Sequence, residues 1–131
     1  MSAELSYSAA EELLERYARA WTEFDGDLIV AIHTEDQESH EDPFEPPLVG
    51  HNALREALLH AARVEEQVEF TFERHWVVER TILAPWHASY VDRESRARVR
   101  MAGFAVFEIS DDGRIAKGRS WSTSRAETPA V

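Results

Sequence analysis

The first half of the chain places its apolar residues at the spacing of helices. The stretch Ser8-Ala9-Ala10-Glu11 has the pattern of a capping box, which predicts the start of a helix. Apolar residues then recur three or four positions apart, as they do on one face of a helix. They are Leu13, Leu14, Tyr17, Ala18, Trp21 and Phe24. Gly26 ends this predicted helix, Asp27 caps a short second helix, and a third is predicted from about residue 52 to residue 63.

The second half of the chain alternates with a period of two, which is typical of strands that bury one face. The predicted strands cover residues 68–78, 82–91, 96–109 and 114–125. The sequences "DRES" and "SDDG" predict turns between them. A shorter alternating stretch lies earlier, at 37–42, and the last residues, 126–131, are predicted to be disordered.

Helices followed by a long meander of strands predict an α+β fold. Because long strands twist and coil, we expect a cone-shaped, curved antiparallel sheet wrapped around three N-terminal helices. The space that such a cone leaves is the expected position of an apolar pocket. A chain of 131 residues fits one domain, 1–131, with a core over about residues 8–125.

Composition and charge narrow the partners that we expect. The formal net charge of -11 repels phosphate backbones and anionic lipids, so neither nucleic acid nor membrane is an expected partner. No stretch approaches the length of an apolar membrane span, and the first residues lack the pattern of a signal peptide, so we expect a cytoplasmic protein. The absence of cysteine excludes disulfides, thiol catalysis and Cys-ligated zinc.

The acidic stretch "SHEDPFEPPLVG" carries the candidate chemistry. Asp42 ends the alternating stretch directly before Pro43, and no Lys or Arg lies between Arg19 and Arg55. One interpretation is a solvated loop. The other is a general base whose carboxylate faces an apolar cavity, with Glu41 pointing to solvent because neighbouring strand residues face opposite sides. The histidines and acids of this stretch match no metal-ligand spacing, so we expect no metal and no other cofactor.

Two long segments resemble a known family. The segment "ERYARAWTEFDGDLIVAIHTEDQESHEDPFEPPLVGHNALREAL" resembles the N-terminal half of ketosteroid isomerases and SnoaL-like polyketide cyclases, which belong to the nuclear transport factor 2-like superfamily. The segment "VRMAGFAVFEISDDGRIAKGRSWS" resembles the closing hairpin of that family. The resemblance covers roughly residues 8–125 and supports the cone-shaped fold. It indicates the reaction less specifically, because this fold hosts many chemistries.

The resemblance implies roles for individual residues. Asp42 stands where ketosteroid isomerases keep their general base, and Tyr17 where they keep the tyrosine that donates to the oxyanion. The second donor of that family, a protonated aspartic acid, aligns with Ala105 and is therefore missing. His40 shares a predicted strand face with Asp42, so it could orient that carboxylate, or it could be a plain strand histidine.

These observations favour a cofactor-free enzyme that acts by general acid/base catalysis on a small, largely apolar carbonyl compound. The reaction would be an isomerisation, a cyclisation or a dehydration. The alternative is a non-catalytic module of the same fold that binds a small molecule or another chain. A homodimer through the outer sheet face is expected, because the strands carry more apolar residues than one pocket can cover. The residues expected to bind substrate are Trp21, Trp86, Met101, Ala105, Phe107, Ser120 and Ser122.

Overall fold

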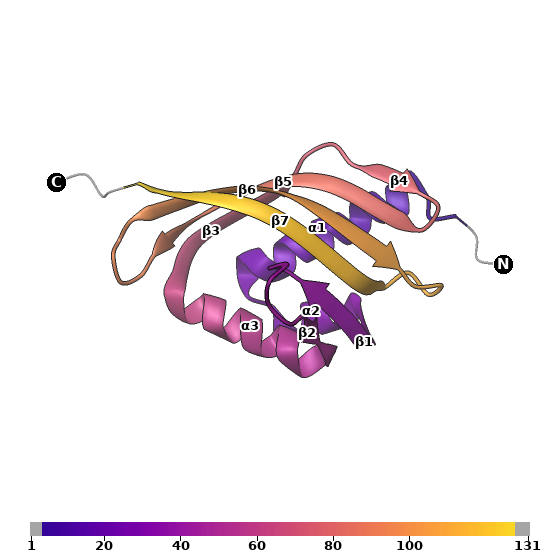
Figure 1. Cartoon of the computed structure of the whole chain (residues 1–131), viewed down its shortest axis with the longest axis horizontal. Helices are drawn as coiled ribbons and strands as arrows, with labels where there is room; N and C mark the ends of the chain where they lie inside the picture. The colour runs from indigo at the N-terminus through magenta and orange to yellow at the C-terminus, as the bar shows by residue number, and fades with distance from the viewer. Residues whose placement is uncertain (1–3, 128–131) are drawn as a thin grey trace.

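The structure, a computed structural model, describes residues 4–127 and confirms the α+β class. Its three helices are α1 (Tyr7–Glu23), α2 (Gly26–Ala31) and α3 (Gly50–Val64). Its strands are β1 (His33–His40), β2 (Leu48–Val49), β3 (Glu65–Phe72), β4 (Trp76–Val78), β5 (Thr81–Asp92), β6 (Arg98–Ile109) and β7 (Ile115–Glu127). Figure 1 shows the long strands curving over the helices.

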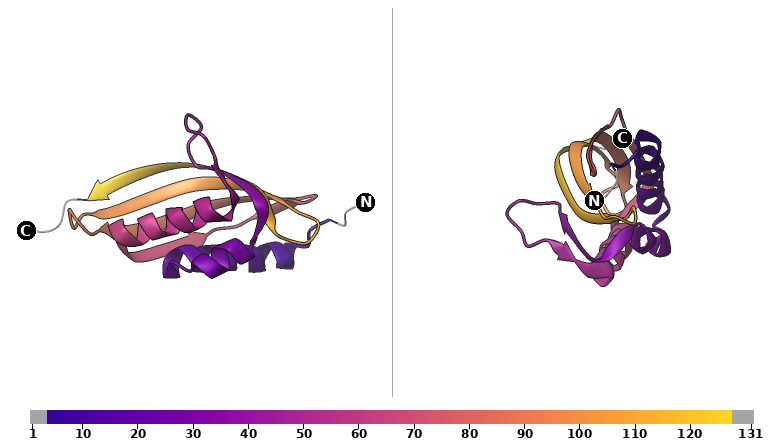
Figure 2. Two further views of the ribbon diagram at one scale, coloured as in Figure 1. Left: turned by 90° about the horizontal axis from the view of Figure 1, so that it is seen from below. Right: turned by 90° about the vertical axis from the view of Figure 1, so that its right-hand side faces the viewer.

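The strands form one curved sheet in the order β2-β1-β7-β6-β5-β3, and β4 pairs with β5. The pairs from β3 to β7 are antiparallel, as expected. The pair of β1 with β7 is parallel, so the sheet is mixed rather than purely antiparallel. The entry of the chain into β1 is fixed beside β7 by the Ile115 N–H, which donates to the Ile32 carbonyl at 2.7 Å. In Figure 2 the sheet curls into an unclosed cone with α1 along its open side.

The helices begin earlier than the sequence pattern predicts. Ser6, not Ser8, caps α1, since its hydroxyl accepts the Ala9 N–H at 3.1 Å. Asp25, not Asp27, caps α2 by accepting the Leu28 N–H at 3.0 Å. In both cases the cap lies just before the helix, where its oxygen reaches an N–H that has no partner within the helix.

Several predicted strand boundaries are wrong. The stretch predicted at 37–42 belongs to β1, which begins at His33 and ends at His40, so residues 41 and 42 follow the strand. The predicted strand 68–78 is divided into β3 and β4, because residues 73–75 leave the ladder and the Glu73 N–H bonds the Pro85 carbonyl. His75 is buried there against Tyr7, with the two rings stacked 3.9 Å apart. At the other end, β7 continues through Glu127, so the first two residues of the predicted disordered tail are strand. Residues 128–131 of that tail lie outside the described residues.

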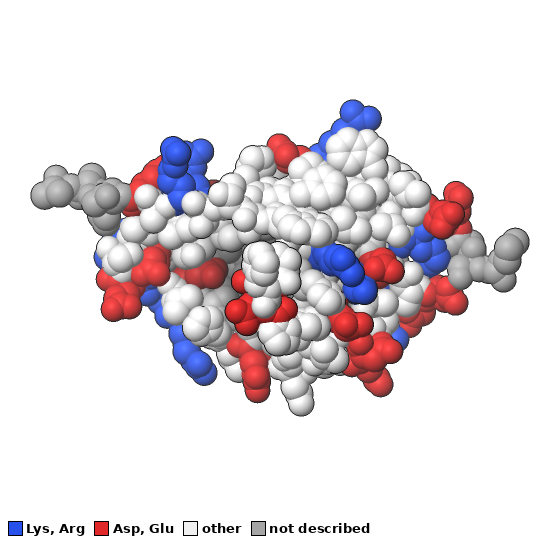
Figure 3. All heavy atoms as spheres, in the orientation of Figure 1, with Lys and Arg blue, Asp and Glu red and all other residues white. Residues whose placement is uncertain are grey.

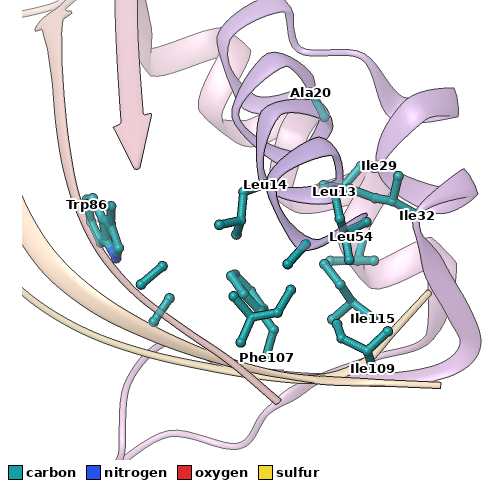
Figure 4. Packing of buried hydrophobic residues seen from close by; sticks show 14 of the residues in the cluster. Leu13, Leu14, Ala20, Ile29, Ile32, Leu54, Trp86, Phe107, Ile109 and Ile115 are labelled. Carbon is teal, nitrogen blue, oxygen red and sulfur yellow. The ribbon is translucent and has the colours of Figure 1, made fainter. Parts of the chain in front are cut away.

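The hydrophobic core occupies one end of the cone. Figure 4 shows Ile29, Ile32 and Leu54 from the helical layer meeting Ile115 of the sheet, while Trp86 lies apart from them. All of these side chains are buried. Because the helical packing is concentrated at this end, the sheet around Trp86 is left to line a cavity.

Candidate active site

A cavity of about 210 Å³ lies between α1 and the concave face of the sheet. Its wall comes from α1, from the chain just after β1, and from β3, β5, β6 and β7. Segments from both halves of the sequence therefore build one site. The described residues around it fall into an aromatic wall, a wall of small side chains, and a pair of carboxylates.

Aromatic rings form the wall next to α1. The Tyr17 ring centroid lies 5.1 Å from that of Phe107, 5.8 Å from that of Phe72 and 6.0 Å from that of Phe70. Phe70 in turn stacks on Trp86, with centroids 5.1 Å apart and planes at 17°. Each ring is thus held by neighbouring rings, and together they present an apolar surface of fixed shape.

The sheet leaves room for a ligand by placing small residues opposite these rings. Ala88, Ala105, Ser120 and Ser122 line the cavity from β5, β6 and β7. The Ser120 hydroxyl accepts the indole N–H of Trp86 at 3.0 Å and so fixes the orientation of that ring. Strand register brings Ala105 opposite Ser120 on the same inward face.

The seven residues expected to bind substrate all lie along this cavity. They are Trp21, Trp86, Met101, Ala105, Phe107, Ser120 and Ser122. That they bind a substrate stays a prediction. Sequence reasoning did not assign Glu41, Glu65, Val68, Phe70, Phe72 or Ala88 to the site, although these residues line it as well.

Tyr17 lies on the cavity side of α1, as expected. Burial raises the pKa of its hydroxyl above the ordinary value of 10.0, and the charge of Glu41 raises it further. The nearby indole of Trp21 acts in the opposite direction. The net pKa is raised, so Tyr17 keeps its proton at neutral pH and can serve as a hydrogen-bond donor to an oxygen in the cavity.

Two carboxylates line the same cavity. Burial raises the pKa of Glu41, which follows β1 directly. Burial also raises the pKa of Glu65, the first residue of β3, and the charge of Glu41 adds to the shift. Glu41 as a whole residue is exposed, which places it at the mouth of the cavity with one side toward solvent. A carboxyl group in this position binds a proton more readily than one in free solution.

The prediction that Asp42 faces the cavity is wrong, whereas Glu41 is exposed to solvent as predicted but also lines the cavity. Asp42 is exposed on the loop after β1, where its carboxylate accepts the Phe44 N–H at 2.9 Å. Glu41 lines the cavity instead. In Figure 2 the loop between β1 and β2 projects from the body of the molecule, and Phe44 within it is 93% exposed.

The side chains before Asp42 do alternate between the two sides of the strand. However, the set that points inward is the one predicted to point outward. Gln37 is 0% exposed, and its amide donates to the carbonyls of Leu48 at 3.2 Å and Gly50 at 3.0 Å. The Ser39 hydroxyl donates to the Gln37 side-chain oxygen at 2.6 Å. These hydrogen bonds satisfy a fully buried amide, so the polar residues Gln37, Ser39 and Glu41 share the inward direction.

His40 lies beside Glu38 rather than beside Asp42. Its Nε2 is 3.6 Å from a carboxylate oxygen of Glu38, which is longer than a hydrogen bond. This nitrogen is buried and has no hydrogen-bond partner among residues 4–127. The structure therefore places His40 outside the group formed by Tyr17, Glu41 and Glu65.

Within the described part of the chain, no group of three or more His, Asp or Glu side chains could hold a metal ion. The most deeply buried histidine, His33, has a structural role, because its Nδ1 donates to the Ile29 carbonyl at 2.7 Å. Burial lowers its pKa to about 4, so His33 stays neutral. Over the same residues, no helix is both long enough and apolar enough to cross a membrane.

This fold and cavity define a protein of the nuclear transport factor 2-like superfamily. The family model of the SnoaL-like domain matches residues 14–118, and the chain belongs to that family. A search of curated proteins found no match.

Solved structures share the fold at low sequence identity. TsrD from Streptomyces laurentii is 20% identical over 92% of this chain and 91% of its own, with a TM-score of 0.77. A ketosteroid isomerase-like protein from Catenulispora acidiphila, in complex with trimethylamine, is 10% identical over 84% of each chain, with a TM-score of 0.76. SalBIII, an epoxide hydrolase/cyclase-like enzyme in pyran ring formation of salinomycin, is 19% identical over 89% of this chain and 95% of its own, with a TM-score of 0.78.

Proposed function

We propose that the protein is a cofactor-free enzyme that acts by general acid/base catalysis on a small, largely apolar carbonyl compound. Glu41 is the base, in the role that the sequence suggested for Asp42, and Tyr17 donates to the oxyanion. One observation carries this proposal: a carboxylate with a raised pKa and a protonated tyrosine line the same aromatic-walled cavity.

The proposed step is the removal of a proton from the carbon next to the carbonyl group. Glu41 takes the proton, the electron pair of the broken C–H bond forms a C=C bond, and the carbonyl π electrons move to oxygen. A base whose pKa lies nearer to the working pH than that of a free carboxylate suits this transfer. Tyr17 stabilises the oxyanion by a hydrogen bond in a site that excludes most water.

The enolate can then react in more than one way, and the proposal covers three outcomes. Return of the proton to another carbon isomerises the compound, loss of a leaving group dehydrates it, and attack on an internal carbonyl closes a ring. The cavity volume of about 210 Å³ favours a compact substrate. The epoxide hydrolase/cyclase-like character of SalBIII supports chemistry of this kind in the same fold.

Proton exchange tests the proposed step without knowledge of the natural substrate. Small cyclic ketones such as cyclopentanone and cyclohexanone are incubated with the protein in D2O, and the loss of their α-proton signals is followed by NMR. We expect exchange above the buffer rate, and a fall of about 100-fold or more in Glu41→Gln. Glu35→Gln, a matched change of an exposed acid on β1, serves as control. Equal rates in Glu41→Gln and the unmutated protein would contradict the assignment of the base.

A second candidate function is the binding of a small alkylammonium ion without a reaction. Two carboxylates and the faces of several aromatic rings line the cavity, and both groups attract a cation. The trimethylamine complex of the Catenulispora acidiphila protein supports this candidate. Titration with trimethylamine, compared with the neutral tert-butanol, distinguishes it from the first. Binding of the amine, weakened in Glu41→Gln and unaccompanied by α-proton exchange with any ketone, would favour the binding module.

We also propose that the chain forms a homodimer through the convex face of the sheet. Trp76, Val78, Phe104 and Trp121 are exposed on that face, and Phe104 lies directly opposite Trp121 in the β6–β7 ladder. Figure 3 shows few charged side chains over these strands, whereas acids gather on the helical side. An apolar patch with a charged rim is typical of an interface.

A further inference from the structure

The indole N–H of Trp21 is a buried donor without an acceptor. Trp21 lines the cavity from α1, and its Nε1 has no hydrogen-bond partner among residues 4–127. A buried N–H without a partner is costly, and in native proteins it usually has a reason. The other tryptophan of this cavity is different, because Ser120 satisfies the N–H of Trp86.

The Trp21 donor lies next to the hydroxyl of Tyr17. The two residues are four positions apart on α1, so their side chains lie on the same face of the helix. Their ring centroids are 6.4 Å apart with planes at 52°. The indole N–H is near enough to the phenol oxygen to favour the ionised form of Tyr17, although the two do not complete a hydrogen bond. Two donors from one helix therefore lie side by side in the wall of the cavity.

We propose that Trp21 is the second donor to the substrate oxyanion, beside Tyr17. This inference rests on the proposed function and adds a catalytic residue to it. The resemblance places the second donor of the family at Ala105, which has no polar side-chain atom and is buried. The Trp21 N–H supplies the missing hydrogen bond from the opposite side of the cavity, at the helix.

The proposed step moves negative charge within the cavity and adds none to it. Glu41 and Glu65 line the cavity, Tyr90 lines it from β5, and Asp92 lies opposite Glu65 in the β3–β5 ladder. Before the step, the negative charge resides on Glu41. When Glu41 takes the proton, it becomes neutral and the charge appears on the substrate oxygen. The total charge in the cavity does not change, and the two donors attract it to the oxygen beside α1.

The binding of an anionic probe tests the donor pair independently of turnover. Glu41→Gln mimics the protonated base and provides the background. In that background, para-nitrophenolate presents an oxyanion, and para-nitrotoluene presents a neutral group of similar shape. We expect Trp21→Phe to weaken the binding of para-nitrophenolate by about tenfold, because a hydrogen bond to a charged group is lost. The same change should alter the affinity for the neutral compound by less than about twofold, because phenylalanine keeps an aromatic wall.

An equal loss for both compounds, or no loss for either, would overturn the donor role and leave Trp21 as a plain wall residue. Failure of the proposed function has a different signature. If no ketone exchanges its protons, the enzyme proposal fails, while the phenolate titration still measures the donor pair. If exchange occurs but Trp21→Phe binds phenolate normally, only the donor role fails.

A measurement on the unmutated chain covers the case in which Trp21→Phe does not fold. The chain has 4 tryptophans, so heteronuclear NMR gives few indole N–H signals. These are assigned by Trp76→Phe and Trp121→Phe, which change exposed positions, together with Trp86→Phe. On addition of para-nitrophenolate we expect the Trp21 indole proton to move downfield, while that of Trp86 keeps its bond to Ser120. A Trp21 signal that does not move in a chain that binds the probe would overturn the proposal.

Discussion

The two faces of the curved sheet carry similar aromatic residues in opposite environments. On the concave face, Trp86 is 7% exposed and Phe107 is 4% exposed, whereas on the convex face Phe104 is 37% exposed and Trp121 is 47% exposed. Phe104 and Phe107 belong to the same strand, so local composition does not separate them. The difference comes from α1, which lies along the concave face alone. The concave face thereby gains a cavity in which a carboxyl pKa is raised, and the convex face stays available for another chain.

The largest effect that we expect on the concave face follows from Tyr17→Phe. Loss of the hydroxyl removes a donor to the oxyanion, so α-proton exchange should fall by about 100-fold. The free energy of unfolding should change by only about 1 kcal/mol, the contribution of one hydrogen bond. Exchange is measured by NMR and stability by urea denaturation. Full exchange activity in a folded variant would return Tyr17 to a packing role.

A change on the convex face should alter assembly and leave the cavity intact. We expect the unmutated chain to have twice the mass of its 15.0 kDa monomer in light scattering at micromolar concentration. Phe104→Ser together with Trp121→Ser should weaken the dimer by about 100-fold or more, because central aromatic residues carry much of an interface's energy. A monomer at every concentration of the unmutated chain would contradict the proposed homodimer.

The sheet is closely packed around Gly103, so we expect a moderate loss of stability in Gly103→Ala. A Cβ at Gly103 would lie 2.5 Å from the Trp86 ring and 2.7 Å from the backbone oxygen of Trp121. The ring or the strand must move, so we expect a cost of about 1–3 kcal/mol in urea denaturation. Ala102→Ser, at the neighbouring exposed position, should change stability by less than about 0.5 kcal/mol. Equal stabilities for the two variants would show that Trp86 does not pack as described.

The smallest expected effect is a pH dependence of stability. The folded-state pKa of Glu41 and Glu65 is raised above the ordinary value of 4.5, so the folded protein holds these protons more tightly than the unfolded chain. Their contribution is therefore fully present below pH 4.5 and is lost as the pH rises through the raised values. Glu41→Gln should flatten this part of the curve measured by denaturation at several pH values. A curve as steep as that of the unmutated chain would indicate that Glu41 is not buried.

Hydrophobic periodicity was sufficient for the fold. The spacing of Leu13, Leu14 and Tyr17 predicted α1, and the alternation from Val68 onward predicted the meander. The same alternation placed Trp86 and Phe107 on one side of the sheet. Periodicity did not predict the parallel pairing of β1 with β7, because this contact joins segments about 80 residues apart and leaves no local pattern.

The sequence does not indicate which side chains of the acidic stretch point into the protein. Residues 37–42 are all polar, so neither side of the strand is marked as buried by hydrophobicity. The inward direction is set by Gln37, whose amide is held by two backbone carbonyls of a distant segment. Glu65 was missed for a related reason, since it is the first residue after α3 and belongs to no alternating pattern until β3 pairs with β5.

The most direct test of the account compares two neighbouring carboxylates. Glu41→Gln and Asp42→Asn each replace a carboxylate by an amide of the same shape, one at the cavity and one on the projecting loop. The measurement is the rate of α-proton exchange in a cyclic ketone at a pH above the raised pKa of Glu41. We expect the exchange rate to fall by about 100-fold or more in Glu41→Gln and to change by less than about twofold in Asp42→Asn. A large loss in Asp42→Asn with normal exchange in Glu41→Gln would contradict the account.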